Sequence, residues 1–392
     1  MRSLLWLALP LVVAAAGIDA LTFLPLDHPA IQYEKAAPHD PAAALREKLD
    51  AGDARLAYDP EFGYLKSLLQ ALRVPVSSQL LVFSKTSFQS PRISPRMPRA
   101  IYHTDDVSVG YVRGGDVLEI ASVDPRLGTV FYTLDQEKTP QPALVRRGEC
   151  IQCHDGPATL GVPGLLVRSV HAERTGYALL TVPSYVTDHT SPISQRWGGW
   201  YVTGTSGSQF HMGNQTVASR TDTELDLAKG ANVISLSRYL DVDAYLQPTS
   251  DIVSLMILEH KTRMTNLITR LGWETRMGAD EAKLDDVVRE TADYMLFTNE
   301  MPLKEPIAGS GRYLSDFVAH GPRDHQGRSL RDLDLKTRMF RYPCSFLIYS
   351  QQFDALPRIA KDKLYRRLFA LLKERKRDDV IEILRDTKQD IP

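Results

Sequence analysis

The sequence has few cysteines and no dominant charge. Its 392 residues contain only three cysteines, so the scattered even set that forms disulfides in secreted domains is absent. Lys and Arg total 47 and Asp and Glu total 48, a net charge of −1, which excludes an overall electrostatic field that would attract nucleic acid. Repeats and low-complexity tracts are also lacking. With 43% hydrophobic and 24% charged residues, the composition is typical of a globular chain.

A long hydrophobic run is absent beyond the amino terminus. There, one Arg precedes an apolar run from Leu4 to Ala16, which is shorter than the roughly 20 residues of a membrane-spanning helix. This pattern predicts an export signal over residues 1–20, with cleavage after Ala16 or Ala20. An uncleaved anchor is the alternative. We therefore expect a periplasmic or otherwise exported protein whose mature chain has no transmembrane helix.

Two of the three cysteines lie close together in "RRGECIQCHDG", residues 146–156. A disulfide between Cys150 and Cys153 would close too small a loop to constrain the unfolded chain. A redox dithiol needs a following helix, whereas prolines and glycines follow here. A structural zinc site needs four ligands, and only Cys344 remains. The spacing C-x-x-C-H is the attachment signature of haem c, which predicts one haem bound covalently through Cys150 and Cys153, with His154 as the proximal iron ligand.

At this motif the sequence resembles the c-type cytochromes. The resemblance implies a short helix over residues 142–153 that carries the cysteines and a proline-containing loop after His154. A backbone carbonyl of this loop, near Pro157 or Pro163, is expected to accept the Nδ1 hydrogen of His154. Outside this segment, stretches such as "RWGGWYVTG", "FHMGN" and "RYPCSFLIYSQQFDALP" resemble a group of large, exported, single-haem bacterial cytochromes. That resemblance implies an architecture and no particular reaction.

The hydrophobic pattern predicts an α+β fold, with antiparallel sheet regions flanking a central cytochrome c-like haem segment and a helical carboxy-terminal half. Residues 21–78 form an amino-terminal extension with a helix. Residues 79–249 form a β-rich region that contains the haem segment 142–168, with strands over 79–133 and further strand-like pieces over 164–204. Residues 250–392 are helical, with helices near 251–272, 281–298, 329–340 and 357–387.

The second axial position of the iron decides between an electron carrier and a catalyst. His260 lies on the apolar face of the predicted helix 251–272, where it is either an iron ligand or a core histidine with a backbone partner. His211 and Met212 follow glycines that permit close approach to a flat cofactor, or they form a simple turn. His189 is expected in a turn.

Arginines and basic segments suggest further contacts. Arg168 and Arg196 are candidates for the haem propionates, or else ordinary surface arginines. The proline-containing segment from Lys85 to Arg99 has four positive charges and no acid, which predicts an exposed docking loop. The carboxy-terminal segment is also net positive and is a second candidate docking surface, although a solvated helix face is the favoured explanation for it.

The sequence predicts an exported c-type cytochrome that transfers electrons to a redox partner protein. A haem enzyme with an open distal site, acting on peroxide or a nitrogen oxide, is the first alternative, and a haem-based redox or gas sensor is the second. The oligomeric state and the reaction partner are not indicated by the sequence.

Overall fold

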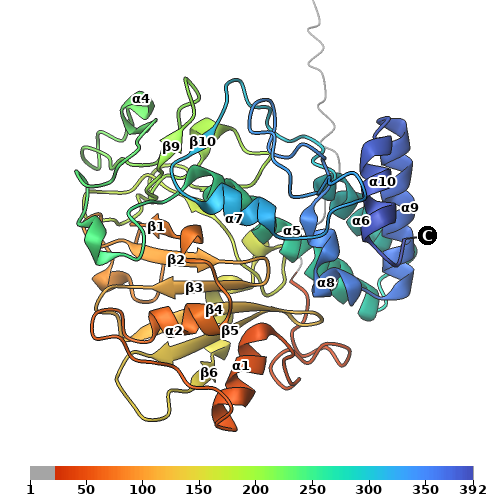
Figure 1. Ribbon diagram of the computed structural model, residues 1–392, viewed down its shortest axis with the longest axis horizontal. Helices are drawn as coiled ribbons and strands as arrows, with labels where there is room; N and C mark the ends of the chain where they lie inside the picture. The colour runs from red at the N-terminus through yellow and green to blue at the C-terminus, as the bar shows by residue number, and fades with distance from the viewer. Residues whose placement is uncertain (1–22, 392) are drawn as a thin grey trace, which may run out of the picture.

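The computed structural model describes residues 23–391, so the predicted export segment 1–20 lies outside the described residues. The fold is α+β, as the sequence predicted. An antiparallel sheet occupies the first half of the chain and helices dominate the second, and the two parts lie side by side in Figure 1. Within residues 23–391, no helix is both long and apolar enough to cross a membrane.

The main sheet is an antiparallel meander in which each strand pairs with the next strand in sequence. Its strands are β1 (Leu80–Val82), β2 (Arg99–His103), β3 (Val107–Tyr111), β4 (Val117–Asp124), β5 (Gly128–Asp135) and β6 (Leu144–Arg146). Two small ribbons lie outside it, one formed by β7 (Arg168–Ser169) and β8 (Tyr185–Val186), the other by β9 (Gly204–Thr205) and β10 (Ala308–Gly309).

The two faces of this sheet have different partners, because side chains alternate along each strand. One face contributes Tyr102, Val109 and Ile120 to a core shared with α1 (Pro41–Asp50) and α2 (Leu65–Ala71). The opposite face packs against α5 (Ile252–Arg276), and there His103 Nε2 lies 2.8 Å from Ser254 Oγ. The central helix α5 therefore joins the sheet to the helical part of the molecule.

The helical part is built around α5, which begins where the Asp251 carboxylate accepts the Val253 N–H at 2.8 Å. The other helices of this part are α6 (Glu281–Met295), α7 (Tyr313–Ala319), α8 (Gln351–Asp354), α9 (Arg358–Glu374) and α10 (Asp378–Thr387), while the short α4 (Leu227–Gly230) lies apart from them (Figure 1). Leu364, Leu368 and Leu371 of α9 are buried in the same core as α5 and α6.

One predicted helix is wrong and another is divided. Residues 329–340 form turns instead of a helix, because the side chain of Asp334 accepts the N–H groups of Lys336 and Thr337 and Leu335 has a positive φ of 56°. The predicted helix 357–387 is interrupted at Lys376, where φ is 54°, so that α9 and α10 form a helical hairpin.

Two predictions near the haem segment also need correction. Only the last part of the expected helix 142–153 is helical, because β6 (Leu144–Arg146) pairs with β5 as the last strand of the sheet. A short 3-10 turn (Gly148–Cys150) and α3 (Ile151–His154) follow. In the region 164–204, the expected strands shrink to the two-residue pieces β7 and β8 and a long irregular connection.

Candidate functional site

The site is built on the helical turn that follows the last strand of the sheet. Residues Gly148–Cys150 and Ile151–His154 form two consecutive helical turns. Cys150 and Cys153 are three residues apart, so their side chains lie on the same face of the turn. Both thiols are unpaired, with Cys150 half-buried and Cys153 exposed. They are therefore accessible to a group that reacts with both.

The two ring nitrogens of His154 differ in their surroundings. Nδ1 lies 2.9 Å from the carbonyl oxygen of Gly164. A carbonyl can only accept, so Nδ1 carries the proton and Nε2 carries the free lone pair. Within residues 23–391, Nε2 makes no hydrogen bond, and it is not completely shielded from solvent. His154 therefore keeps an unprotonated ring nitrogen without a protein partner, as a metal-ligating histidine requires.

The carbonyl that orients His154 belongs to the loop of residues 155–165, which we call the proximal loop. The sequence placed this acceptor near Pro157 or Pro163, and the structure places it at Gly164, the residue after Pro163. The Gly164 N–H also donates to the His154 carbonyl at 2.9 Å, so the loop closes back on the histidine. On its sheet side, the Thr129 N–H of β5 donates to the Pro163 carbonyl at 3.1 Å.

The sheet supplies the surroundings of the imidazole. The ring of Phe131, on β5, packs against His154 with 4.7 Å between ring centroids. Removal of the ring from water lowers the pKa of His154, and the nearby Arg99 adds to this effect, while Glu119 and the hydrogen bond to Gly164 act in the opposite direction. At neutral pH the imidazole is therefore neutral, which is the form that binds a metal.

Cys150 does not have the electrostatic environment of a reactive thiolate. Burial, with contributions from Glu149 and Glu119, raises the pKa of its thiol to about 11. Redox dithiols instead depend on a lowered thiol pKa. The thiol of Cys150 is thus protonated at neutral pH.

His260 lies in a buried aromatic cluster of the helical part. Its Nδ1 is 2.9 Å from His189 Nδ1, and its Nε2 is 2.8 Å from Ser345 Oγ. The rings of Tyr294 and Phe297 stack on it, with centroids 5.4 and 4.5 Å away. Both ring nitrogens have protein partners, so iron ligation by His260 would require one of these hydrogen bonds to break.

His211 and Met212 lie beside the irregular segment 196–200. His211 Nδ1 accepts the Gly213 N–H at 3.1 Å, its ring meets the edge of Trp197, and burial lowers its pKa to about 4. Its Nε2 has no hydrogen-bond partner in the described chain. Met212 Sδ lies 3.6 Å from Ser169 Oγ. Neither the contacts of His211 nor those of His260 include a residue of the Cys150–His154 turn or of the proximal loop.

The arginines considered for the propionates occupy different environments. Arg168 is exposed. Arg196 is buried and forms an ion pair with the equally buried Glu259 at 3.2 Å, and it also donates to the His189 carbonyl at 3.1 Å. Arg196 is therefore occupied by Glu259 of α5 and by the backbone carbonyls of His189 and Ser191.

Two of the four positive charges of the segment Lys85–Arg99 are paired with acids of β4 and of the residues just before it. Arg92 pairs with Asp116 at 2.7 Å and Arg99 pairs with Glu119. The expected docking loop is thus exposed at Phe88 but is less positive than its sequence indicates.

Several relevant contacts were not predicted from the sequence. His189, expected only in a turn, also contacts the ring of His260. Asn266 and Arg270 of α5 hold the proximal loop. Their spacing of four residues on one helix was visible in the sequence, but the loop that they contact lies about 100 residues earlier and nothing local identifies it.

No family model, no curated protein and no solved structure matches this chain. Among residues 23–391, no group of three or more His, Cys, Asp or Glu side chains gathers as a metal site. A haem iron takes only one or two ligands from the protein, so the His154 geometry does not depend on such a group.

Proposed function

We propose that this protein is an exported c-type cytochrome that carries one haem, bound covalently through Cys150 and Cys153, and transfers electrons to a redox partner protein. The observation that carries the proposal is the arrangement of His154. Its Nδ1 is held by a backbone carbonyl, its Nε2 makes no hydrogen bond within residues 23–391, and the two unpaired thiols belong to the same pair of helical turns. The C-x-x-C-H spacing and the amino-terminal export pattern support the same proposal.

Different residues of the chain would attach the haem, ligate its iron and orient the ligand. The two thiols would supply the covalent attachment, and His154 would supply the proximal ligand. The Gly164 carbonyl keeps the imidazole in one tautomer and raises its basicity, and Phe131 shields one side of the ring from water. When bound, the haem supplies one-electron oxidation and reduction.

A substitution at each kind of cysteine tests the proposal. Protein matured in a host with cytochrome c assembly should keep its haem in denaturing gels and in acidified acetone. Cys153→Ser should lose most of the haem-stained protein, whereas Cys344→Ser, a buried cysteine outside the motif, should retain it. Free extraction of haem from the wild type would contradict covalent attachment.

A haem enzyme with an open distal position is the second candidate function. It is favoured by the contacts of His260 and His211, none of which reaches the haem segment. An open position would leave the reduced iron high-spin and able to bind carbon monoxide. A low-spin spectrum in both oxidation states would instead favour the electron carrier.

A further inference from the structure

The proximal loop is held from two sides. On one side, the Thr129 N–H of β5 donates to its Pro163 carbonyl. On the other side, two residues of α5, one helical turn apart, donate to loop carbonyls. Asn266 Nδ2 lies 2.8 Å from the Leu165 carbonyl oxygen, and Arg270 Nη1 lies 2.8 Å from the Leu160 carbonyl oxygen. The acceptor of His154 lies between these two anchors.

Asn266 is the closer of the two anchors to the acceptor peptide. It is 2% exposed, and its Oδ1 is buried with no hydrogen-bond partner. A Cβ at Gly164 would lie 2.1 Å from this Oδ1, so only glycine lets the loop approach the amide so closely. The carbonyl that Asn266 binds is that of Leu165, which belongs to the next peptide unit after the one that contains the Gly164 carbonyl. Asn266 therefore fixes the peptide next to the carbonyl that accepts the His154 proton.

We propose that Asn266 is a positioning residue for His154, acting through the Gly164–Leu165 backbone to hold the Nδ1 hydrogen bond and thereby set the basicity of Nε2. This inference rests on the proposed function, because it concerns the histidine as an iron ligand. It assigns to the carboxy-terminal helical part a direct role in tuning the haem site, although the motif itself lies in the β-rich region.

The test measures the hydrogen bond itself as well as the haem. In haem-loaded Asn266→Ala, the loop loses its anchor, so exchange of the His154 Nδ1 proton with solvent should become roughly five- to tenfold faster, the factor for one ordinary hydrogen bond. NMR on protein carrying ¹⁵N-histidine follows this exchange. The midpoint potential should rise, because a weaker hydrogen bond lowers the basicity of the ligand and stabilises ferric iron less.

Asn266→Asp gives a second readout that a purely structural role would not produce. A carboxylate cannot donate to the Leu165 carbonyl, whereas the protonated acid can. Both the exchange rate and the potential should therefore return toward the wild-type values as the pH falls through the pKa of the new acid. The matched control is Thr262→Ala, on the same helix, since Thr262 Oγ1 binds only the Glu259 carbonyl of its own helix.

The outcomes separate the two proposals. A wild type that attaches no haem overturns the proposed function and this inference with it. A haem-loaded wild type, combined with an Asn266→Ala variant that matches Thr262→Ala in exchange rate and potential, overturns the inference alone.

Discussion

At His154, one hydrogen bond decides which ring nitrogen is free. A histidine whose Nδ1 faced water could exchange tautomers, and its Nε2 would be protonated part of the time. The Gly164 carbonyl removes that freedom, because it accepts only the Nδ1 proton. The chemistry of the site therefore depends on the exact path of the proximal loop, and two glycines of that loop allow this dependence to be tested.

We expect Gly164→Ala to damage the site and Gly156→Ala to leave it intact. The new Cβ at position 164 would meet the Asn266 amide at 2.1 Å, whereas nothing lies within 4 Å of a Cβ at position 156. Overpacking of this kind costs about 1–3 kcal/mol. Urea unfolding of both variants measures the difference, and equal stability of the two would show that the loop is less tightly held than the structure indicates.

We expect different results when each candidate for the second axial ligand of the proposed haem is replaced by alanine. His260→Ala should lower the free energy of unfolding by about 1–3 kcal/mol, because His189 and Ser345 lose a buried partner, while the haem spectrum stays unchanged. In His211→Ala, loss of low-spin bands would identify the ligand, since its Nε2 is free. The same loss in Met212→Ala would identify Met212 as the ligand. Loss of low-spin bands in His260→Ala would contradict the assignment of that residue to the core.

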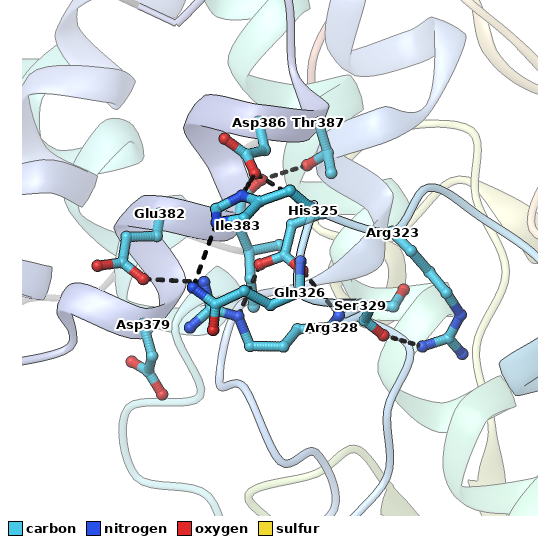
Figure 2. Close-up of polar contacts among 12 residues, drawn as sticks. Arg323, His325, Gln326, Arg328, Ser329, Asp379, Glu382, Ile383, Asp386 and Thr387 are labelled. Carbon is cyan, nitrogen blue, oxygen red and sulfur yellow. Dashed lines mark hydrogen bonds and ion pairs between the residues drawn. The ribbon is translucent and has the colours of Figure 1, made fainter.

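At the scale of elements, α10 is fastened to the segment of residues 323–329 by a surface network, which Figure 2 shows. Arg328 donates to Glu382 of α10 at 2.8 Å and to Asp324 of its own segment at 2.6 Å. The exposed His325 binds Asp386, near the end of the same helix. Side-chain contacts, without a helix in this segment, therefore hold residues 324–328 against α10.

The His325–Asp386 pair should make this contact dependent on pH. The hydrogen bond from His325 lowers the pKa of Asp386, and Asp386 in turn raises the pKa of His325. The contribution of the histidine is complete below its unfolded pKa and is lost as the pH rises through the raised value. That of the aspartate is complete above its own unfolded pKa and is lost as the pH falls through the lowered value. The pair is therefore intact only between these two limits.

Replacement of Asp386 by asparagine should return the pKa of His325 toward its ordinary value. NMR titration of the imidazole protons measures this, with the resonance assigned from His325→Gln. Asp379→Asn is the matched control on α10, because Asp379 pairs with Arg377 and not with the histidine. An unchanged titration in Asp386→Asn would refute the pairing.

At the scale of the whole molecule, the sequence predicted the elements with strong local patterns. The alternating strands of residues 79–133 and the long apolar helix after Ser250 both form. The predictions failed where distant partners decide the conformation. Residues 144–146 join the sheet because β5 offers an edge, and the turns around Asp334 depend on side-chain hydrogen bonds that periodicity does not detect.

The candidate site was likewise predictable where local spacing decides it and unpredictable where distant residues do. The C-x-x-C-H motif names Cys150, Cys153 and His154 by local spacing alone. The support from Asn266 could not be read from the sequence, because about 100 residues separate it from the loop that it holds. Likewise, the apolar helical spacing around His260 correctly indicated burial but did not reveal that His189 and Ser345 occupy both of its ring nitrogens.

The most direct test of the covalent haem is the mass of one tryptic peptide. Cleavage after Arg147 and Arg168 releases residues 148–168, which contain both motif cysteines and the proximal loop. From protein matured in a host with cytochrome c assembly, this peptide should carry the mass of one haem, and thiol alkylation of the denatured protein should label Cys344 alone. A peptide of unmodified mass with Cys150 and Cys153 both alkylated would contradict the account.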